Sequence, residues 1–390
     1  MVPLWKINRE IKRIGLQIRN IPAAIADLYE LAQEPRRRRE HFAKLNERVA
    51  VIDGKIAETD RVVIFLIYQP DGISQSTIEL CENMIDLGFS PFLVTNSKLS
   101  PADEEKLRTV AWKIMTRPNF GYDFGGYQDA LFALRKIKDD LEYLIVMNDS
   151  VWLEFSREVW QNILSENAHI VGLVRETKMD EIDQNKVKYE YQNLQSYFYF
   201  IKSDLWKSPV FWEFWLNYKM VNNKKRTIKN GEILFTKFLD KNNIAISELI
   251  TKEKFLEKVY QADNHTLKKV FRYASFLNTR NENDNHDIFT RFQDRTLWRE
   301  EAIKQIKRTI SSSPLNGSYW VAVCILFKVN LIKKNKEPIN CKMRKSYLEA
   351  IDNGETQTVS PKICAELRDA AKVDSDKIQV QWSTVKLLEK

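Results

Sequence analysis

Hydrophobic and polar positions follow two different periods along the first half of the chain. Unbroken runs of β-branched and aromatic residues at 61–69, 89–97 and 112–117 predict buried strands, whereas 76–87 and 100–111 have the polar starts typical of helices. Strands that alternate with helices predict a mainly parallel sheet flanked by helices, with a ligand beyond the carboxyl ends of the strands. The expected fold class is therefore α/β.

A second pattern covers the N-terminus, where apolar side chains recur every three or four residues from Leu4 to Leu28 with lysines and arginines between them. This spacing predicts a helix with one apolar stripe. Two interpretations stay open. The helix docks on its own domain, which we favour, or it lies as a basic amphipathic helix on an anionic membrane surface.

Net charge and cysteine content indicate which partners and which cell compartment to expect for the protein. The net charge of +8 indicates an anionic partner. The four cysteines are far apart and follow no recognisable signal peptide, which predicts reduced thiols in the cytoplasm. The apolar run at 319–327 is too short to cross a bilayer, and the basic residues that follow it at 328–336 favour a peripheral position at the inner face of the membrane.

Two polar motifs interrupt this pattern where chemistry is expected. The corner RPNFGYDFGGYQDAL, at 117–131, follows the third predicted strand, and Asn148, Asp149 and Ser150 break a fourth strand at 143–155. We expect both motifs at the carboxyl ends of neighbouring strands, facing one crevice. The glycines would let a ligand approach the main chain. Alternatively, they serve only the turn, and Asp123 caps the helix that follows.

A crevice of this kind suits transfer of a sugar from a nucleotide donor. The leaving diphosphate must be neutralised by a divalent ion on carboxylates or by basic side chains, and the acceptor hydroxyl needs a general base. Asp149 and Glu232 are the acids best placed for these two tasks. Glu190 and Asp204 are the alternatives for the base, and Glu232 has the simpler alternative of capping a helix start.

The corner motif, YLIVMNDSVW, NLQSYFYF and NGEILFTKFL occur in an order and spacing that resembles the rhamnan synthesis protein F family of bacterial polysaccharide assembly. The resemblance covers about 61–238. It implies a GT-A-like, Rossmann-type mixed sheet flanked by helices, with helical N- and C-terminal extensions. It also implies an inverting rhamnosyltransferase that uses dTDP-rhamnose to extend a polyprenyl-linked glycan such as lipopolysaccharide O-antigen.

Position in the predicted crevice, together with the resemblance, gives candidate roles to individual residues. Glu232 is the candidate base, and Asp149 is a catalytic residue and the candidate ligand of Mg²⁺ or Mn²⁺. The candidate donor-binding residues are Arg117, Asn119, Gly121, Tyr122, Asp123, Asn148, Gln195 and Ser196. Asn193 stands where the family pattern has a histidine, and the motif around Asp149 offers one carboxylate in place of a pair, which leaves the metal requirement open.

We expect a basic helical region at 1–58, a nucleotide-sugar-binding catalytic domain at 59–260, a completing segment at 261–345 and a polar appendage at 346–390. Within the completing segment, the residues at 261–295, rich in Asn, Asp and Arg, are interpreted as loop. The sequence allows two other functions: an inactive transferase-like scaffold at the membrane, and an RNA-binding protein. RNA binding is disfavoured because no RNA-recognition motif is present.

Overall fold

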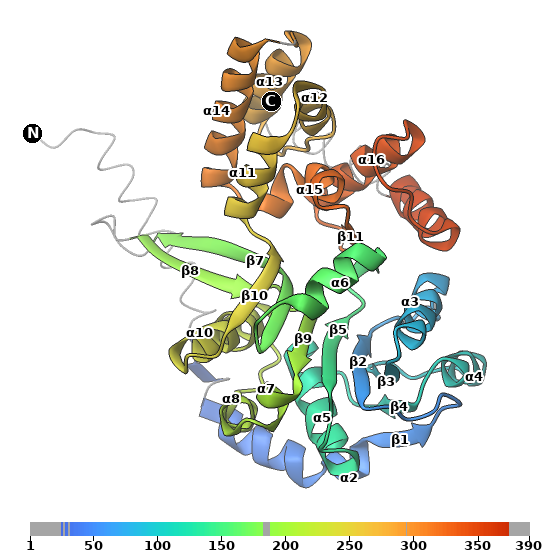
Figure 1. Ribbon diagram of the computed structural model, residues 1–390. Helices are drawn as coiled ribbons and strands as arrows, with labels where there is room; N and C mark the ends of the chain where they lie inside the picture. Colours follow the sequence, from blue (N-terminus) through green and yellow to red (C-terminus); the bar gives the residue numbers. More distant parts are fainter. Residues whose placement is uncertain (1–24, 26–27, 30–31, 182–187, 294, 374–390) are drawn as a thin grey trace, which may run out of the picture.

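The computed structural model describes residues 25, 28–29, 32–181, 188–293 and 295–373 (Figure 1). Most of the predicted apolar stripe that starts at Leu4 lies outside the described residues. Its described members Ile25 and Leu28 are exposed, and residues 32–43 are helical and lead into the short helix α2 (Leu45–Arg48).

In the described part of the chain, nine strands form one mixed sheet (Figure 1). Their order across the sheet is β1 (Ala50–Asp53), β4 (Lys113–Thr116), β3 (Ser90–Thr95), β2 (Arg61–Ile67), β5 (Tyr143–Asn148), β9 (Phe198–Lys202), β7 (Ile170–Glu181) and β10 (Ile246–Ile250), with β8 (Lys188–Leu194) paired to β7. Strands β2 to β5 are parallel, whereas β9 runs antiparallel between β5 and β7. The predicted mixed α/β sheet is confirmed.

The central strand β2 shows why the sheet needs helices on both faces. Val63, Phe65 and Ile67 belong to one buried core, and the alternate residues at 62, 64 and 66 belong to another. On the first face lie α3 (Gln75–Asp86), α4 (Pro101–Thr109) and α6 (Arg157–Ser165); on the second lie α5 (Tyr122–Ile137), α7 (Ser203–Lys207), α8 (Pro209–Asn217) and α10 (Leu234–Lys241). A strand buried on both faces reads as an unbroken hydrophobic run, as β2 does.

The interpretation of residues 261–295 as loop is wrong. The segment forms α12 (Asn264–Arg272) and α13 (Thr279–Thr290), which pack with α11 (Lys252–Gln261) and α14 (Thr296–Ser312) beyond the sheet (Figure 1). Part of its Asn and Asp content serves as helix caps, because the side chains of Asp263 and Asn278 accept hydrogen bonds from backbone N–H groups in the first turns.

The C-terminal part of the chain returns to the main core. After η2 (Leu315–Gly317), the apolar run forms the buried helix α15 (Trp320–Phe327), and β11 (Asn330–Lys333) then pairs antiparallel with β6 (Val151–Glu154). Helix α16 (Pro338–Asp352) and a helical segment at 361–373 follow. None of the helices in the described residues is both long and apolar enough to cross a membrane.

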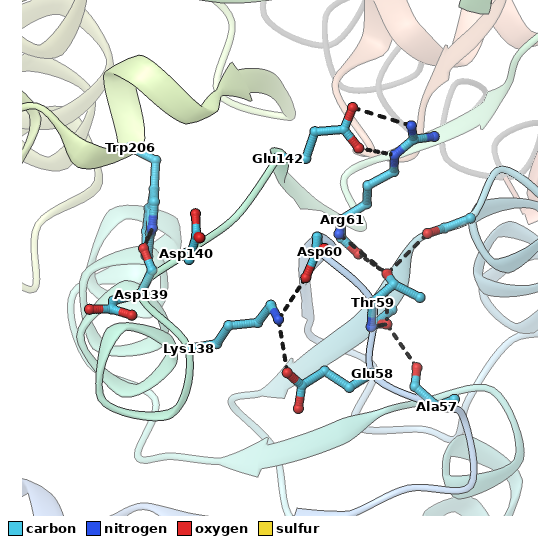
Figure 2. A network of polar contacts seen from close by, with 12 residues as sticks. Ala57, Glu58, Thr59, Asp60, Arg61, Lys138, Asp139, Asp140, Glu142 and Trp206 are labelled. Atoms are coloured by element: carbon cyan, nitrogen blue, oxygen red, sulfur yellow. Dashed lines mark hydrogen bonds and ion pairs between the residues drawn. The ribbon is translucent and has the colours of Figure 1, made fainter.

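The amino ends of β2 and β5 are joined by a polar network at the opposite end of these strands from Asp149 (Figure 2). The guanidinium of Arg61 donates to both carboxylate oxygens of Glu142, at 2.7 and 3.3 Å. Lys138, just after α5, lies 2.9 Å from carboxylate oxygens of Glu58 and Asp60. These exposed ion pairs tie the start of the sheet to the end of α5.

A π turn interrupts a helix on the second face of the sheet. Helix α9 (Lys224–Ile228) continues through η1 (Lys229–Ile233), a π-helical turn, into α10. Glu232 therefore lies inside a helix, and the alternative in which it caps a helix start is wrong. Gly231 allows the turn to approach α5, because a Cβ at this position would lie 2.4 Å from Cγ of Phe124.

We expect Gly231→Ala to lower the free energy of unfolding by roughly 1–3 kcal/mol, because the added methyl group must displace a buried aromatic ring. Urea unfolding measures this change. Gly317→Ala is the matched control, since the nearest atom to its new Cβ is Cδ of Pro314 at 3.9 Å. Equal effects of the two substitutions would show that the Phe124 contact does not limit residue 231.

Candidate functional site

The corner before α5 has an uncommon backbone conformation. Gly121 and Tyr122 have φ angles of 80° and 52°, which places two consecutive residues in the left-handed region. A Cβ on Gly121 would lie 2.4 Å from Cγ of Met220, so glycine is required there for space as well as for conformation. Tyr122 is a non-glycine residue with positive φ, a feature that is concentrated at functional sites.

Arg117 holds this corner together from the inside. Its buried guanidinium donates to Asp129 Oδ2 at 2.7 Å, to Asn96 Oδ1 at 2.8 Å and to the carbonyl oxygen of Phe120 at 2.7 Å. His41, from the N-terminal helical segment, lies 2.9 Å from the other oxygen of Asp129. The geometry gives Arg117 a positioning role in the corner, and Asn119, two residues later, is exposed.

The corner and the strand break meet, although β4 and β5 are not neighbouring strands as expected. Strands β3 and β2 lie between them, and α5 crosses over the sheet so that Gly126 packs on Leu66 of β2. As a result, Asn148 Nδ2 donates to Asp123 Oδ2 at 3.0 Å. Asp149 accepts the backbone N–H of Tyr68 at 2.9 Å, which ties the ends of β5 and β2 together.

Glu232 faces the same region from the π turn and is buried. Its Oε1 accepts hydrogen bonds from the side-chain amides of Asn193 and of Gln195, the latter at 2.9 Å. Asn193 is thus in direct contact with the candidate base at the position where the family pattern has a histidine. A π turn inside an α-helix is itself a frequent mark of a functional site.

Lys333 and Lys334, from the C-terminal region, complete the site. Their place in the basic run at 328–336 had favoured a contact with the membrane instead. Pairing of β11 with β6 sets Lys333 opposite Val151, and the backbone N–H of Lys334 donates to the carbonyl oxygen of Ser150 at 2.9 Å. Lys333 Nζ lies 3.5 Å from Gln195 Oε1. The only hint in the sequence was a basic run after an apolar segment, which carries no information about its pairing partner.

These contacts define what we call the polar cluster. It consists of Asp123, Asn148, Asp149, Gln195, Glu232, Lys333 and Lys334. The carbonyl of Ser196 borders it and accepts the hydroxyl of Tyr127 at 2.8 Å. Asp204 lies on α7, beyond the other end of β9, and pairs with His169 at 3.2 Å, and Glu190 lies on β8 four residues before Leu194. Asp204, with its His169 partner, therefore lies apart from the cluster.

The pKa values of the acids in the polar cluster are shifted by burial and by one another's charge. Burial raises the pKa of Asp123 to about 6, and the negative charges of Asp149 and Glu232 add to the effect. Burial also raises the pKa of Asp149, with Lys334 and the amide of Tyr68 acting in the opposite direction. Burial lowers the pKa of Lys334, and the charges of Asp149 and Glu366 oppose that shift.

The residues present do not form a cage for a divalent cation. Among the described residues, no group of three or more His, Cys, Asp or Glu side chains is arranged to hold a metal ion. One oxygen of Asp149 accepts the backbone N–H of Tyr68, and the positive charge of Lys334 favours the ionised form of Asp149. Mg²⁺ in nucleotide sites usually takes one or two carboxylate ligands from the protein and further ligands from the phosphates, so the role of Asp149 is a matter for the donor-binding experiments below.

Comparison with known proteins identifies one family and one similar protein. The family model of rhamnan synthesis protein F matches residues 92–266. The chain is 30% identical over 277 residues to the uncharacterized protein y4gN of Sinorhizobium fredii (strain NBRC 101917 / NGR234), an alignment that covers 70% of this chain and 68% of the relative. The range matched by the family model contains Asp123, Asp149 and Glu232 and ends before β11 with its lysines.

We expect Asp123→Asn to stabilise the protein at pH 7.5. The ordinary pKa of 3.8 is raised to about 6 on folding, so the native state binds the proton more tightly and the free energy of unfolding falls as pH rises from about 4 to 6. The substitution removes the cost of keeping an ionised carboxylate buried, which is about 1–3 kcal/mol of the free energy of unfolding. Melting temperatures of variant and wild type should differ at pH 7.5 and converge towards pH 4.5.

Asp71→Asn, at an exposed position, is the matched control and should leave the melting temperature unchanged at both pH values. A lower melting temperature for Asp123→Asn at pH 7.5 would mean that the ionised carboxylate of Asp123 stabilises the fold.

Proposed function

The chain belongs to the rhamnan synthesis protein F family, and from this membership and the polar cluster we propose that it is an inverting rhamnosyltransferase. The family gives it a glycosyltransferase-type role in polysaccharide biosynthesis. The finer proposal is that it transfers a deoxysugar from a nucleotide sugar, with dTDP-rhamnose as the donor, to a polyprenyl-linked cell-surface glycan. The reaction would take place at the cytoplasmic face of the membrane.

The observation that supports this proposal is that Asp123 lies close enough to both Asp149 and the buried Glu232 for their charges to raise its pKa, while the charge of Lys334 lowers the pKa of Asp149. A glycosyl transfer needs a carboxylate and a cationic group on either side of the anomeric carbon. One receives a proton from the acceptor, and the other balances the charge that develops on the leaving diphosphate.

In the proposed reaction, an acceptor hydroxyl attacks the anomeric carbon from the face opposite the nucleotide. The new C–O bond forms as the bond to the diphosphate oxygen breaks, and the hydroxyl proton passes to Glu232. The amides of Asn193 and Gln195 hold the Glu232 carboxylate in place. Because the attack occurs in a single displacement, the anomeric configuration inverts.

The donor would lie across the ends of β2 and β5. Lys333 and Lys334 would neutralise the diphosphate, and Asp123 and Asn148 would accept and donate hydrogen bonds to sugar hydroxyls. Tyr68, which is 53% exposed after β2, and the backbone amides after Gly121 are further donor contacts in this arrangement.

Replacing Glu232 with Gln should lower the transfer rate by about 10² to 10⁴, because the amide keeps the shape of the side chain but cannot take the acceptor proton. Affinity for the nucleotide sugar should stay near that of wild type, since the base acts on the acceptor. Transfer assays with dTDP-rhamnose and calorimetric titration measure the two quantities. Glu253→Gln, which changes an exposed acid on α11, is the control.

If Glu232→Gln keeps most of its transfer rate, Glu232 is not the base. Loss of donor affinity in place of rate would instead assign it to the donor site. A wild-type protein that binds the donor and transfers nothing to any lipid-linked acceptor would support the inactive scaffold.

Lys334→Met should weaken dTDP-rhamnose binding at least about tenfold, because the diphosphate loses a charge-assisted partner in a part-buried site. Lys336→Met removes an exposed lysine two residues away and should bind the donor as wild type does. Transfer by the wild-type protein should survive EDTA. If EDTA abolishes transfer and Lys334→Met leaves donor affinity unchanged, a metal ion on Asp149 and not Lys334 neutralises the diphosphate.

A further inference from the structure

A basic groove lies on the second face of the sheet, apart from the polar cluster. It has a volume of about 730 Å³ and runs between α8 and the helix formed by α9, η1 and α10. We call it the basic groove. Its cationic lining residues are Lys219, Lys225, Arg226, Lys229, Lys237 and Lys241.

The charge of the basic groove is strongly one-sided. Five lysines and Arg226 line it, against a single acid, Glu213. All five lysines are exposed, so their charges reach into solvent. Cations gathered in one concave surface attract anions more strongly than the same charges spread over a protein.

Apolar side chains lie between these cations. Leu234 lines the groove and is 43% exposed. Phe214 and Phe238 form the floor. An exposed leucine beside lysines suits the boundary between lipid headgroups and acyl chains, whereas single-stranded nucleic acid is held by exposed aromatic rings that stack on bases.

One helix carries both the basic groove and the candidate base. Lys229, Leu234 and Lys241 line the groove, whereas Glu232 is buried and turned to Asn193 and Gln195 on the other side.

We propose that the basic groove docks the protein on a bilayer surface that contains anionic phospholipid. The lysines contact headgroup phosphates, and Leu234 enters the boundary with the acyl chains. This inference concerns binding and does not depend on the transfer reaction proposed above. It moves the expected membrane contact from Lys333 and Lys334, which lie in the polar cluster, to the exposed face of the neighbouring helix.

Sedimentation of the full chain with vesicles tests the proposal. Wild type should bind vesicles of phosphatidylcholine with about 30% phosphatidylglycerol and leave pure phosphatidylcholine unbound. The double variant Lys229→Glu with Lys241→Glu should weaken this binding at least about tenfold. Lys304→Glu/Lys345→Glu makes the same charge change at exposed positions on α14 and α16 and should bind almost as wild type does.

Leu234→Ser separates docking on a bilayer from simple attraction to phosphate. It should weaken vesicle binding while leaving the net charge unchanged, and inorganic phosphate should not displace the wild-type protein. Equal binding by the groove variant and the Lys304/Lys345 control would overturn the proposal. A short single-stranded RNA, added at the same phosphate concentration, tests the alternative. If the RNA displaces the wild-type protein from vesicles and Leu234→Ser does not change vesicle binding, the groove binds nucleic acid instead.

Discussion

The contact between Gly231 and the ring of Phe124 sets the geometry of the polar cluster. Phe124 follows Asp123 in the first turn of α5, and Gly231 precedes Glu232 in the π turn. The ring is held by its neighbours, with Trp215 stacked at 5.7 Å and Tyr127 edge-on at 5.7 Å between centroids. A rigid aromatic layer therefore brings the two carboxylates together from behind, through a contact that only glycine can make.

This packing opposes electrostatic repulsion. The raised pKa of Asp123 reflects chiefly the cost of burying its carboxylate, and the negative charges of Asp149 and Glu232 add to that cost. Burial of apolar surface around Phe124 supplies the free energy that keeps them in place. Functional sites commonly hold like charges in this way, at the expense of stability.

The sequence predicted those parts of the molecule that depend on local pattern. The strands β2 to β5 and helix α5 follow from unbroken apolar runs and from the corner at 117–131. Asp123 and Asn148 were expected to face one crevice from their positions at strand ends, and the structure joins them by a hydrogen bond. Glu232 was recognised from its motif, although its π turn was not. A π turn results from packing against Phe124, which the local sequence does not encode.

The lysines of the cluster could not have been found in this way. Lys333 lies beside Val151 because two segments distant in sequence pair as β11 and β6, and a four-residue strand carries no signal of its partner. The helices α12 and α13 were missed for another reason: their Asn and Asp residues are helix caps in the folded chain but have the composition of a loop. Arg117 was read as a ligand contact, whereas its buried hydrogen bonds hold the corner.

Positive charge is divided between the two sides of the α9–η1–α10 helix. On one side, Lys333 and Lys334 belong to the polar cluster with Asp149 and Gln195, and their charge is balanced by neighbouring acids. On the other side, the lysines of the basic groove face a single acid and stay exposed to solvent. Because the helix between them is one rigid element backed by the aromatic layer, a surface bound in the groove would have a fixed orientation relative to Glu232. A lipid-linked acceptor needs such an orientation, since its reactive hydroxyl must reach the base while its lipid stays in the bilayer.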